Sequence, residues 1–257
     1  MSPTQIAIAL WTLVHKEIKR FMRIWPQTLL PPSITMTMYF IIFGNLIGSR
    51  IGDMDGFSYM DFIVPGLIMM AVITNSYSNV ASSFFSNKFQ RSIEEMMVSP
   101  MPNWVILAGF VLGGMARGLG VGLIVTIVSL FFTRISMVHP LLTIFVVVLT
   151  SALFSIGGFI NALLADKFDD ISIVPTFILT PLTYLGGVFY SISMLPALWQ
   201  GVSMLNPILY MVNVFRYGFL GVSDIPVVWA LSAIVAFIVV LFGIALWMLD
   251  RGKGIRS

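Results

Sequence analysis

The chain has no cysteine, only two histidines and few charged residues, which make up 10% of its 257 positions. The absence of cysteine excludes a disulfide framework, a thiolate metal site and a cysteine nucleophile. An ordinary soluble domain has roughly 25% charged residues. Because 58% of this chain is hydrophobic, it cannot turn all of its apolar surface inward. We therefore predict an integral membrane protein.

Motifs for nucleotide, metal and nucleic-acid binding are also missing. The sequence has no G-x-x-x-x-G-K-[ST] loop, so we do not expect the chain itself to hold ATP in that way. His15 and His139 are expected near opposite membrane surfaces, which excludes a shared metal site. The net charge is +3, but the fourteen Lys and Arg residues are scattered between apolar segments. They form no basic face, and we expect no nucleic-acid partner and no cofactor in this chain.

Apolar stretches of about 20 residues or more, enough to cross a bilayer, recur along the sequence. They predict an all-α integral membrane fold, with residues 1–257 forming a single transmembrane domain. The third stretch contains Arg117, whose cost of roughly +2.5 to +3.5 kcal/mol is outweighed by the surrounding aliphatic residues. The six predicted spans are residues 28–48, 63–86, 104–132, 141–164, 172–190 and 227–249.

The basic residues predict the orientation of these spans. If both termini are cytoplasmic, only Arg50, Arg134 and Arg216 fall on the outer side, which agrees with the positive-inside rule. We therefore expect a multi-pass membrane protein with both termini in the cytoplasm. The basic residues assigned to the inner side are Lys16, Lys19, Arg20, Arg23, Lys88, Arg91, Lys167, Arg251, Lys253 and Arg256.

Two amphipathic segments are expected on the inner side. Residues 1–25 carry apolar side chains on one helical face and basic ones on the other, which predicts a helix along the inner leaflet. Residues 88–99 place an adaptable methionine face opposite charged positions. This pattern fits a docking helix for a soluble partner as well as a turn resting on lipid. Its apolar positions are Phe89, Ile93, Met96 and Met97.

The uncharged stretch 171–215 is too long for one crossing. Prolines and glycines interrupt it, so we expect one helix to about residue 190 and then a shorter segment that dips into the membrane from the same side. The interrupting residues are Gly186, Gly187, Pro196, Gly201 and Pro207.

Three stretches of the chain resemble the ABC-2-type permeases, the membrane subunits of a class of ABC exporters. The segment IEEMMVSPMP, from Ile93 to Pro102, resembles their first cytoplasmic loop. The region from Pro175 to Gly221 is similar to their C-terminal signature, and FMRIWPQTLLPPSITMTMYFIIFGNLIG to their N-terminal region, so the resemblance covers nearly the whole chain. The matching residues of the signature are Leu195, Pro196, Asn206, Pro207, Tyr210 and Arg216.

This resemblance implies a connecting helix at 1–25, a coupling helix at 88–99 and a re-entrant helical pair at 191–216. It also implies that two copies of the permease pair with two copies of a separate ABC ATP-binding subunit, which carries ATP and Mg. Gate or re-entrant residues would be Gly186, Gly187, Pro196, Asn206, Pro207, Tyr210 and Arg216. Residues that contact the ATP-binding subunit would be Arg91, Glu94, Glu95, Met96, Met97, Asp169 and Asp170.

Arg117 is the one charge inside a predicted span, and a membrane-embedded ionisable group is by default a functional hypothesis. It is a candidate anchor for a phosphate or carboxylate head group, or else it pairs with a neighbouring helix. Gly114, Gly118 and Gly122 share a stripe that favours close helix packing. The aromatic candidates for lining a substrate path, which alternatively face lipid or neighbouring helices, are Phe40, Phe43 and Tyr77.

The function that these features predict is that of an exporter permease. It would move an amphipathic or lipid-like substrate, such as a glycolipid, a lipid or a hydrophobic drug, by alternating access. The predicted spans contain no Asp or Glu, which disfavours a proton-driven carrier. The alternative is a secondary transporter or channel that works without an ATP-binding partner. Besides membrane lipids, the expected partners are the ATP-binding subunit and a second permease.

Overall fold

The computed structural model describes residues 1–134 and 137–254, with only the backbone for Asn45; Arg256, assigned above to the inner side, lies outside them. Almost all of the described chain is helical, as predicted. The elements are α1 (Pro3–Arg23), α2 (Trp25–Tyr39), the π-helical η1 (Phe40–Ile47), α3 (Gly48–Ile51), β1 (Asp53–Met54), β2 (Phe57–Ser58), α4 (Tyr59–Phe89), α5 (Ser92–Val98), α6 (Asn103–Ser129), α7 (Pro140–Leu164), α8 (Asp170–Val174), the π-helical η2 (Pro175–Leu179), α9 (Thr180–Tyr184), the 3-10 helix η3 (Ile192–Met194), α10 (Ala197–Met204), α11 (Pro207–Leu220) and α12 (Val227–Asp250).

Five helical stretches of the described chain are long and apolar enough to cross a membrane. They coincide with the first four and the last of the predicted spans, and every end lies within four residues of its predicted position. The five stretches are Trp25–Ile51, Tyr59–Phe89, Asn103–Ser129, Pro140–Leu164 and Val227–Asp250.

The predicted span 172–190 is helical only over residues 170–184, from α8 to α9. At 1.5 Å per residue this is about 22 Å, less than the roughly 30 Å of a hydrocarbon core. The helix ends early because Gly187 adopts a φ of +71°, a left-handed conformation that favours glycine and stops an α-helix. The prediction of a helix to residue 190 was therefore wrong.

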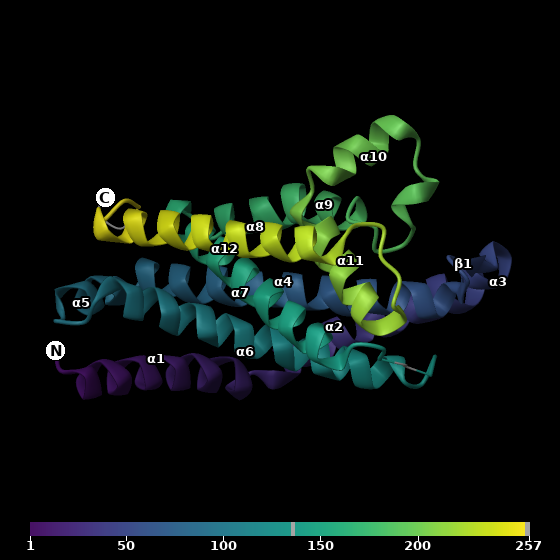
Figure 1. The fold of residues 1–257 in the computed structure, drawn as a ribbon. Coiled ribbons are helices and arrows are strands. Elements are labelled where there is room, and N and C mark those ends of the chain that lie inside the picture. Colours follow the sequence, from purple (N-terminus) through teal and green to yellow (C-terminus); the bar gives the residue numbers. More distant parts are fainter. Residues whose placement is uncertain (135–136, 255–257) are drawn as a thin grey trace.

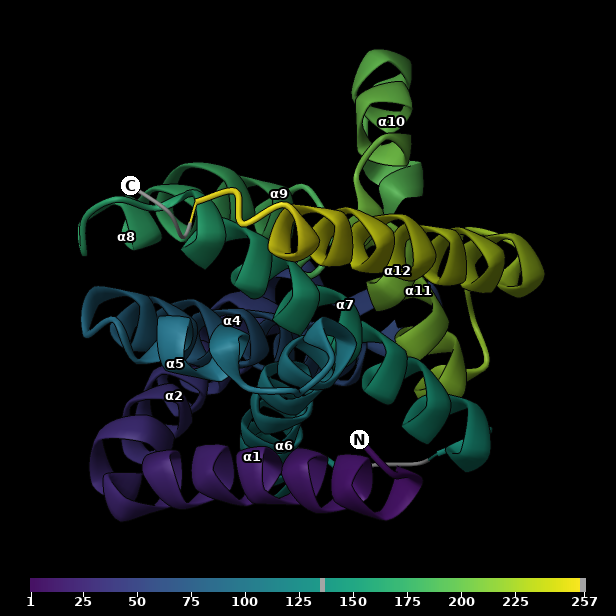
Figure 2. The same cartoon turned by 90° about the vertical axis from the view of Figure 1, so that its left-hand side faces the viewer.

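Helix α4 is the centre of the bundle, buried over most of its length between α6 and α7. Figure 1 shows the N-terminus, the C-terminus and α5 at one end of the molecule, with β1 and α3 at the other. Seen from the first end, α1 and α12 lie on opposite sides of the bundle (Figure 2). Helix α10 stands away from the other helices in both views.

Small residues allow this close packing around α4. Gly114, Gly118 and Gly122 of α6 all face α4, with Ser76 and Val72 of α4 directly against them. The glycine stripe predicted from the sequence therefore packs two helices of one chain. A side chain larger than hydrogen at these positions would hold the helices apart.

At the opposite end from the termini, β1 and β2 form a two-residue antiparallel pair. Asp55 and Gly56 make the turn with positive φ values of 52° and 83°, as the tight hairpin turn requires. Helix α4 then starts at Ser58, whose side chain accepts a hydrogen bond from the Asp61 N–H.

We predict that Gly66→Ala destabilises the bundle. A Cβ at Gly66 would lie 2.7 Å from the Val188 carbonyl oxygen, so the segment after α9 would have to move. Overpacking of this kind costs about 1–3 kcal/mol. Gly120→Ala is the matched control, because a Cβ there meets no atom within 4 Å. The apparent Tm of the detergent-solubilised protein should fall for the first variant and stay or rise for the second; equal shifts would contradict the packing described here.

Candidate functional site

Helix α4 carries a polar stripe along one face. Asn75, Asn79, Ser83 and Asn87 recur every four residues, so they line up on one side of the helix. The first three are buried and Asn87 is half-buried, although most of the surrounding residues are apolar. Buried polar groups need hydrogen-bond partners, and here α1 and α6 supply them.

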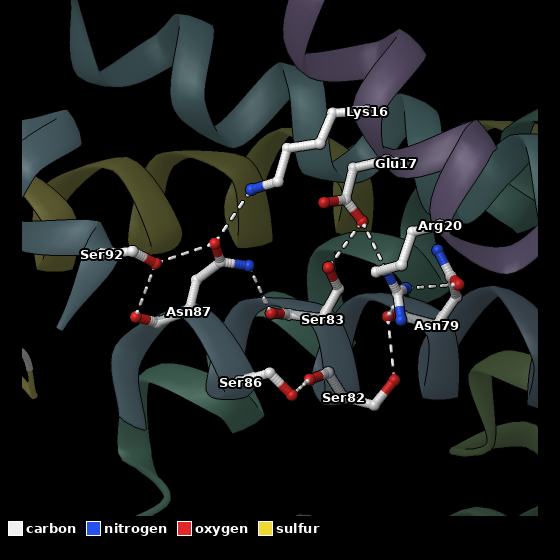
Figure 3. A network of polar contacts seen from close by, with 9 residues as sticks. All are labelled: Lys16, Glu17, Arg20, Asn79, Ser82, Ser83, Ser86, Asn87 and Ser92. Atoms are coloured by element: carbon white, nitrogen blue, oxygen red, sulfur yellow. Dashed lines mark hydrogen bonds and ion pairs between the residues drawn. The ribbon is translucent and has the colours of Figure 1, made fainter. Parts of the chain in front are cut away.

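Three charged residues of α1 bind this stripe, as Figure 3 shows. The Arg20 guanidinium donates to the Asn79 side chain at 2.8 Å and to its carbonyl oxygen at 3.1 Å. The Lys16 ammonium donates to the Asn87 side chain at 2.9 Å. Glu17 lies between them, where its carboxylate accepts from the Ser83 hydroxyl at 2.6 Å.

Glu17 is a fully buried carboxylate. It forms an ion pair with Arg20 at 3.3 Å, while its second oxygen, Oε1, has no hydrogen-bond partner among the described residues. The carboxylate fits here because Gly113 of α6 leaves room for its methylenes, as Gly109 does for Leu13 one turn earlier. Helix α1 is thus held by a charged contact as well as by apolar packing on α6.

Arg117 of α6 binds the same polar stripe at Asn75, one helical turn before Asn79. Its Nη2 donates to the Asn75 side chain at 3.3 Å, and its Nε has no acceptor among the described residues. The guanidinium is therefore bound to a neutral amide of a neighbouring helix.

The space between α1 and the end of α4 is a hollow of about 780 Å³. Four cationic side chains of α1 line it together with Met22. The other side is lined by two hydroxyls and one amide of α4 and by Gln90, which follows α4. The polar lining residues are Lys16, Lys19, Arg20, Arg23, Ser83, Ser86, Asn87 and Gln90. No group of three or more metal-ligating His, Cys, Asp or Glu residues occurs in the described chain.

The predicted coupling segment 88–99 consists of the last turn of α4 and the separate helix α5. Arg91 joins them in a left-handed conformation with φ of 59°. Ile93 is buried, and Met96 and Met97 pack half-buried against the same apolar cluster. The methionine face is thus turned into the bundle. The outward surface of α5 carries Glu94 and Glu95.

The second inner loop lies beside this segment. Phe168 packs on Phe85 and Phe89 with ring centroids 4.8 and 5.1 Å apart. Asp170 accepts hydrogen bonds from the backbone N–H groups of residues 166 and 167, which hold the pKa of its carboxyl below the usual range. Asp169 is exposed next to it. The structure thus places the two predicted partner-contact segments at one end of the bundle.

The predicted gate residues form local contacts that fix α10 and α11 to each other and to neighbouring segments. Arg216 is fully buried, with its guanidinium 3.8 Å above the Phe62 ring, and donates to the Gly187 carbonyl oxygen at 2.5 Å. The Asn206 side chain caps α11 by accepting from the Ile208 N–H at 3.0 Å.

The other gate residues also have local roles. Tyr210 donates to the Met204 carbonyl oxygen at 2.6 Å and so ties the two helices together. Pro196 precedes α10 and Pro207 begins α11, where proline fits the first turn. Gly186 packs against Ile208, where a Cβ would lie only 2.8 Å from that side chain.

The three aromatic path candidates pack against neighbouring segments and do not line the hollow. Phe40 is fully buried and its ring centroid lies 5.5 Å from that of Phe132. Phe43 lies 4.8 Å from Phe189. Tyr77 is buried beside Gly157 of α7.

The polar contacts between α1 and the stripe on α4, called here the α1–α4 seam, were not predicted from the sequence. Arg20 was assigned to an exposed polar face, and no role was given to Glu17 or to the amides of α4. The four-residue spacing of Asn75, Asn79 and their two successors within an uncharged span was the signal that could have revealed it.

We predict strong coupling between Glu17 and Arg20. Glu17→Leu leaves Arg20 without its ion-pair partner and the Ser83 hydroxyl without its acceptor, a loss of about 3 kcal/mol. The double variant Glu17→Leu/Arg20→Leu should cost less than the sum of its single variants, because it removes both charges together. Apparent Tm values in detergent give the comparison, with the exposed Lys19→Leu as control. Strictly additive shifts would show that the pair does not hold α1.

Sequence comparisons agree with this architecture. The profile of the ABC-2 type transporter family matches residues 8–220. The chain is 62% identical over 250 residues to the inner membrane transport permease YadH of Escherichia coli strain K12, covering 97% of this chain and 98% of that protein. It is 24% identical to nodulation protein J of Sinorhizobium fredii, covering 80% and 79% of the two chains. The resemblance noted in the sequence is confirmed, and the protein belongs to the ABC-2 type transporter family.

Proposed function

We propose that the chain is the membrane permease subunit of an ATP-driven exporter of amphipathic or lipid-like substrates in the bacterial inner membrane. The observation that carries this proposal is the surface at the α5 end of the bundle. There, α5 exposes Glu94 and Glu95 and is anchored by the buried Ile93. The loop from residue 166 to 170 lies at the same end of the bundle. A short helix anchored in this way can transmit a push from a soluble partner without bending.

The route of that push runs into the centre of the molecule. Helix α5 is separated from α4 by only residues 90 and 91, and Ile93 fixes it to the apolar cluster that contains Phe84 and Phe85 of α4. Because α4 carries the polar stripe, a displacement of α5 moves the groups that bind α1. Alternating access requires two arrangements of the helices that differ in their contacts. ATP binding to the partner subunit shifts the equilibrium from one arrangement to the other.

ATP and Mg belong in this proposal to a separate ABC ATP-binding subunit. Two copies of it pair with two copies of the permease, and ATP hydrolysis takes place outside this chain. The coupling contacts on the permease are the exposed Glu94 and Glu95, with Arg91 and Asp169 beside them.

The topology also supports six crossings. The two chain ends lie at the same end of the molecule (Figure 1), which requires an even number of passes. In this proposal the five long helices make five crossings and the shorter α8–α9 stretch makes the sixth, after which α10 and α11 form the re-entrant pair. Both termini are cytoplasmic in this proposal, which the excess of Lys and Arg in the segments on that side supports.

A prediction separates this proposal from a transporter that needs no ATP-binding partner. The tagged permease is purified from its host membranes with the ATP-binding subunit that it retains, and ATP hydrolysis and transport are measured in proteoliposomes. In Glu94→Ala/Glu95→Ala, the loss of two interface side chains worth about 1 kcal/mol each should lower transport per ATP roughly 30-fold.

The control for this experiment is Asp53→Ala, an exposed acid at the opposite end of the bundle. It should leave the ratio of transport to ATP hydrolysis within about twofold of the unmodified protein, since it touches no coupling contact. Full transport by the isolated permease, with no ATP-binding protein present, would overturn the proposal.

A further inference from the structure

The hollow between α1 and α4 has an excess of positive charge. Of its four cations, only Arg20 forms an ion pair in the described chain, with Glu17 behind it. Lys19 and Arg23 are exposed at its mouth and have no carboxylate partner within the described residues. Clustered cations next to apolar protein focus a positive potential that attracts anions.

Neutral hydrogen-bonding groups complete the lining. Asn87 and Ser83 of α4 line the hollow. The polar stripe continues from them along α4 to Asn79, which bonds Arg20 (Figure 3). The Asn79 amide nitrogen and the Arg117 Nε have no acceptor among the described residues although both are buried. Hydrogen-bond donors are therefore present both in the hollow and along the polar stripe next to it. An anion with several acceptor oxygens can accept hydrogen bonds from donors of this kind.

The surroundings of the hollow are those of a membrane surface. Met22 lines it, α1 carries Trp11, and α2 begins with Trp25 just beyond the end of α1; these two tryptophans are 69% and 51% exposed. Exposed tryptophans on an amphipathic helix are typical of the interface between lipid head groups and acyl chains. A ligand here is therefore an anion that carries an apolar tail.

We infer that this hollow binds the phosphate head group of an acidic membrane lipid. The phosphate is neutralised by the four cations of α1, Lys16, Lys19, Arg20 and Arg23. The acyl chains of the lipid lie beside Met22 on the lipid-facing surface of α1. Binding itself does not depend on an ATP-binding partner. Only its interpretation as the entry site for the exported substrate rests on the proposed function.

The test measures lipid binding to the full-length permease alone, so its outcome is separate from that of the coupling experiment. The protein is placed in phosphatidylcholine nanodiscs and titrated with fluorescent phosphatidic acid. Lys19→Gln/Arg23→Gln removes two unpaired cations from the hollow without touching the seam. Each basic residue near an anionic lipid contributes about a fivefold factor in affinity. We expect the Kd to rise about 25-fold.

The matched control is Arg50→Gln/Arg134→Gln, which removes the same charge from exposed positions at the other end of the molecule. Its Kd should stay within twofold of the unmodified protein. An equal loss in both double variants, or no loss in either, would overturn the site.

A second arm separates lipid from soluble phosphate. Inorganic phosphate at millimolar concentration should displace little of the bound phosphatidic acid, because it lacks the acyl chains that α1 contacts. Complete displacement by inorganic phosphate, with the same variants affected, would assign the hollow to a soluble anion and overturn the lipid proposal.

Discussion

A buried carboxylate holds the N-terminal helix to the rest of the molecule. Glu17 accepts a hydrogen bond from Ser83 of α4 and forms an ion pair with Arg20, which itself donates to Asn79 of α4. These contacts fix α1 to α4, while Gly109 and Gly113 let α1 pack closely on α6. Removing one partner of a buried charge pair leaves the other unpaired, which is costly in an apolar environment. The position of the cationic hollow depends on this contact, since the hollow has α1 as one wall and α4 as the other.

Helix α4 links the two ends of the permease. Its buried length connects the acidic surface of α5 at one end with the Phe62 ring and carbonyl that hold Arg216 near the other. Because closely packed helices are not easily deformed, the proposed mechanism has a movement at α5 displace α4 as a whole. Glycines of α6 and α7 make the packing tight enough for this role.

Hydrophobic pattern alone predicted most of the fold. Five of six spans, the helix over residues 3–23 and the short helix after Phe89 follow from apolar periodicity and charge. The end of the fifth span was missed because Gly187 takes a left-handed conformation in contact with Leu209 and Ile192, a tertiary effect. The direction of the methionine face was equally hidden, since an amphipathic helix can turn the same face to a partner, to lipid or into its own bundle.

The sequence by itself determined that this chain lies in a membrane, which family it resembles and where its helices run, because those properties depend on local composition and spacing. Only the tertiary structure decided which polar groups meet. Glu17 and Ser83 are 66 positions apart, and Arg117 and Asn75 are 42. Such pairs form only when helices distant in sequence pack at one particular rotation and depth, and no local pattern encodes that choice.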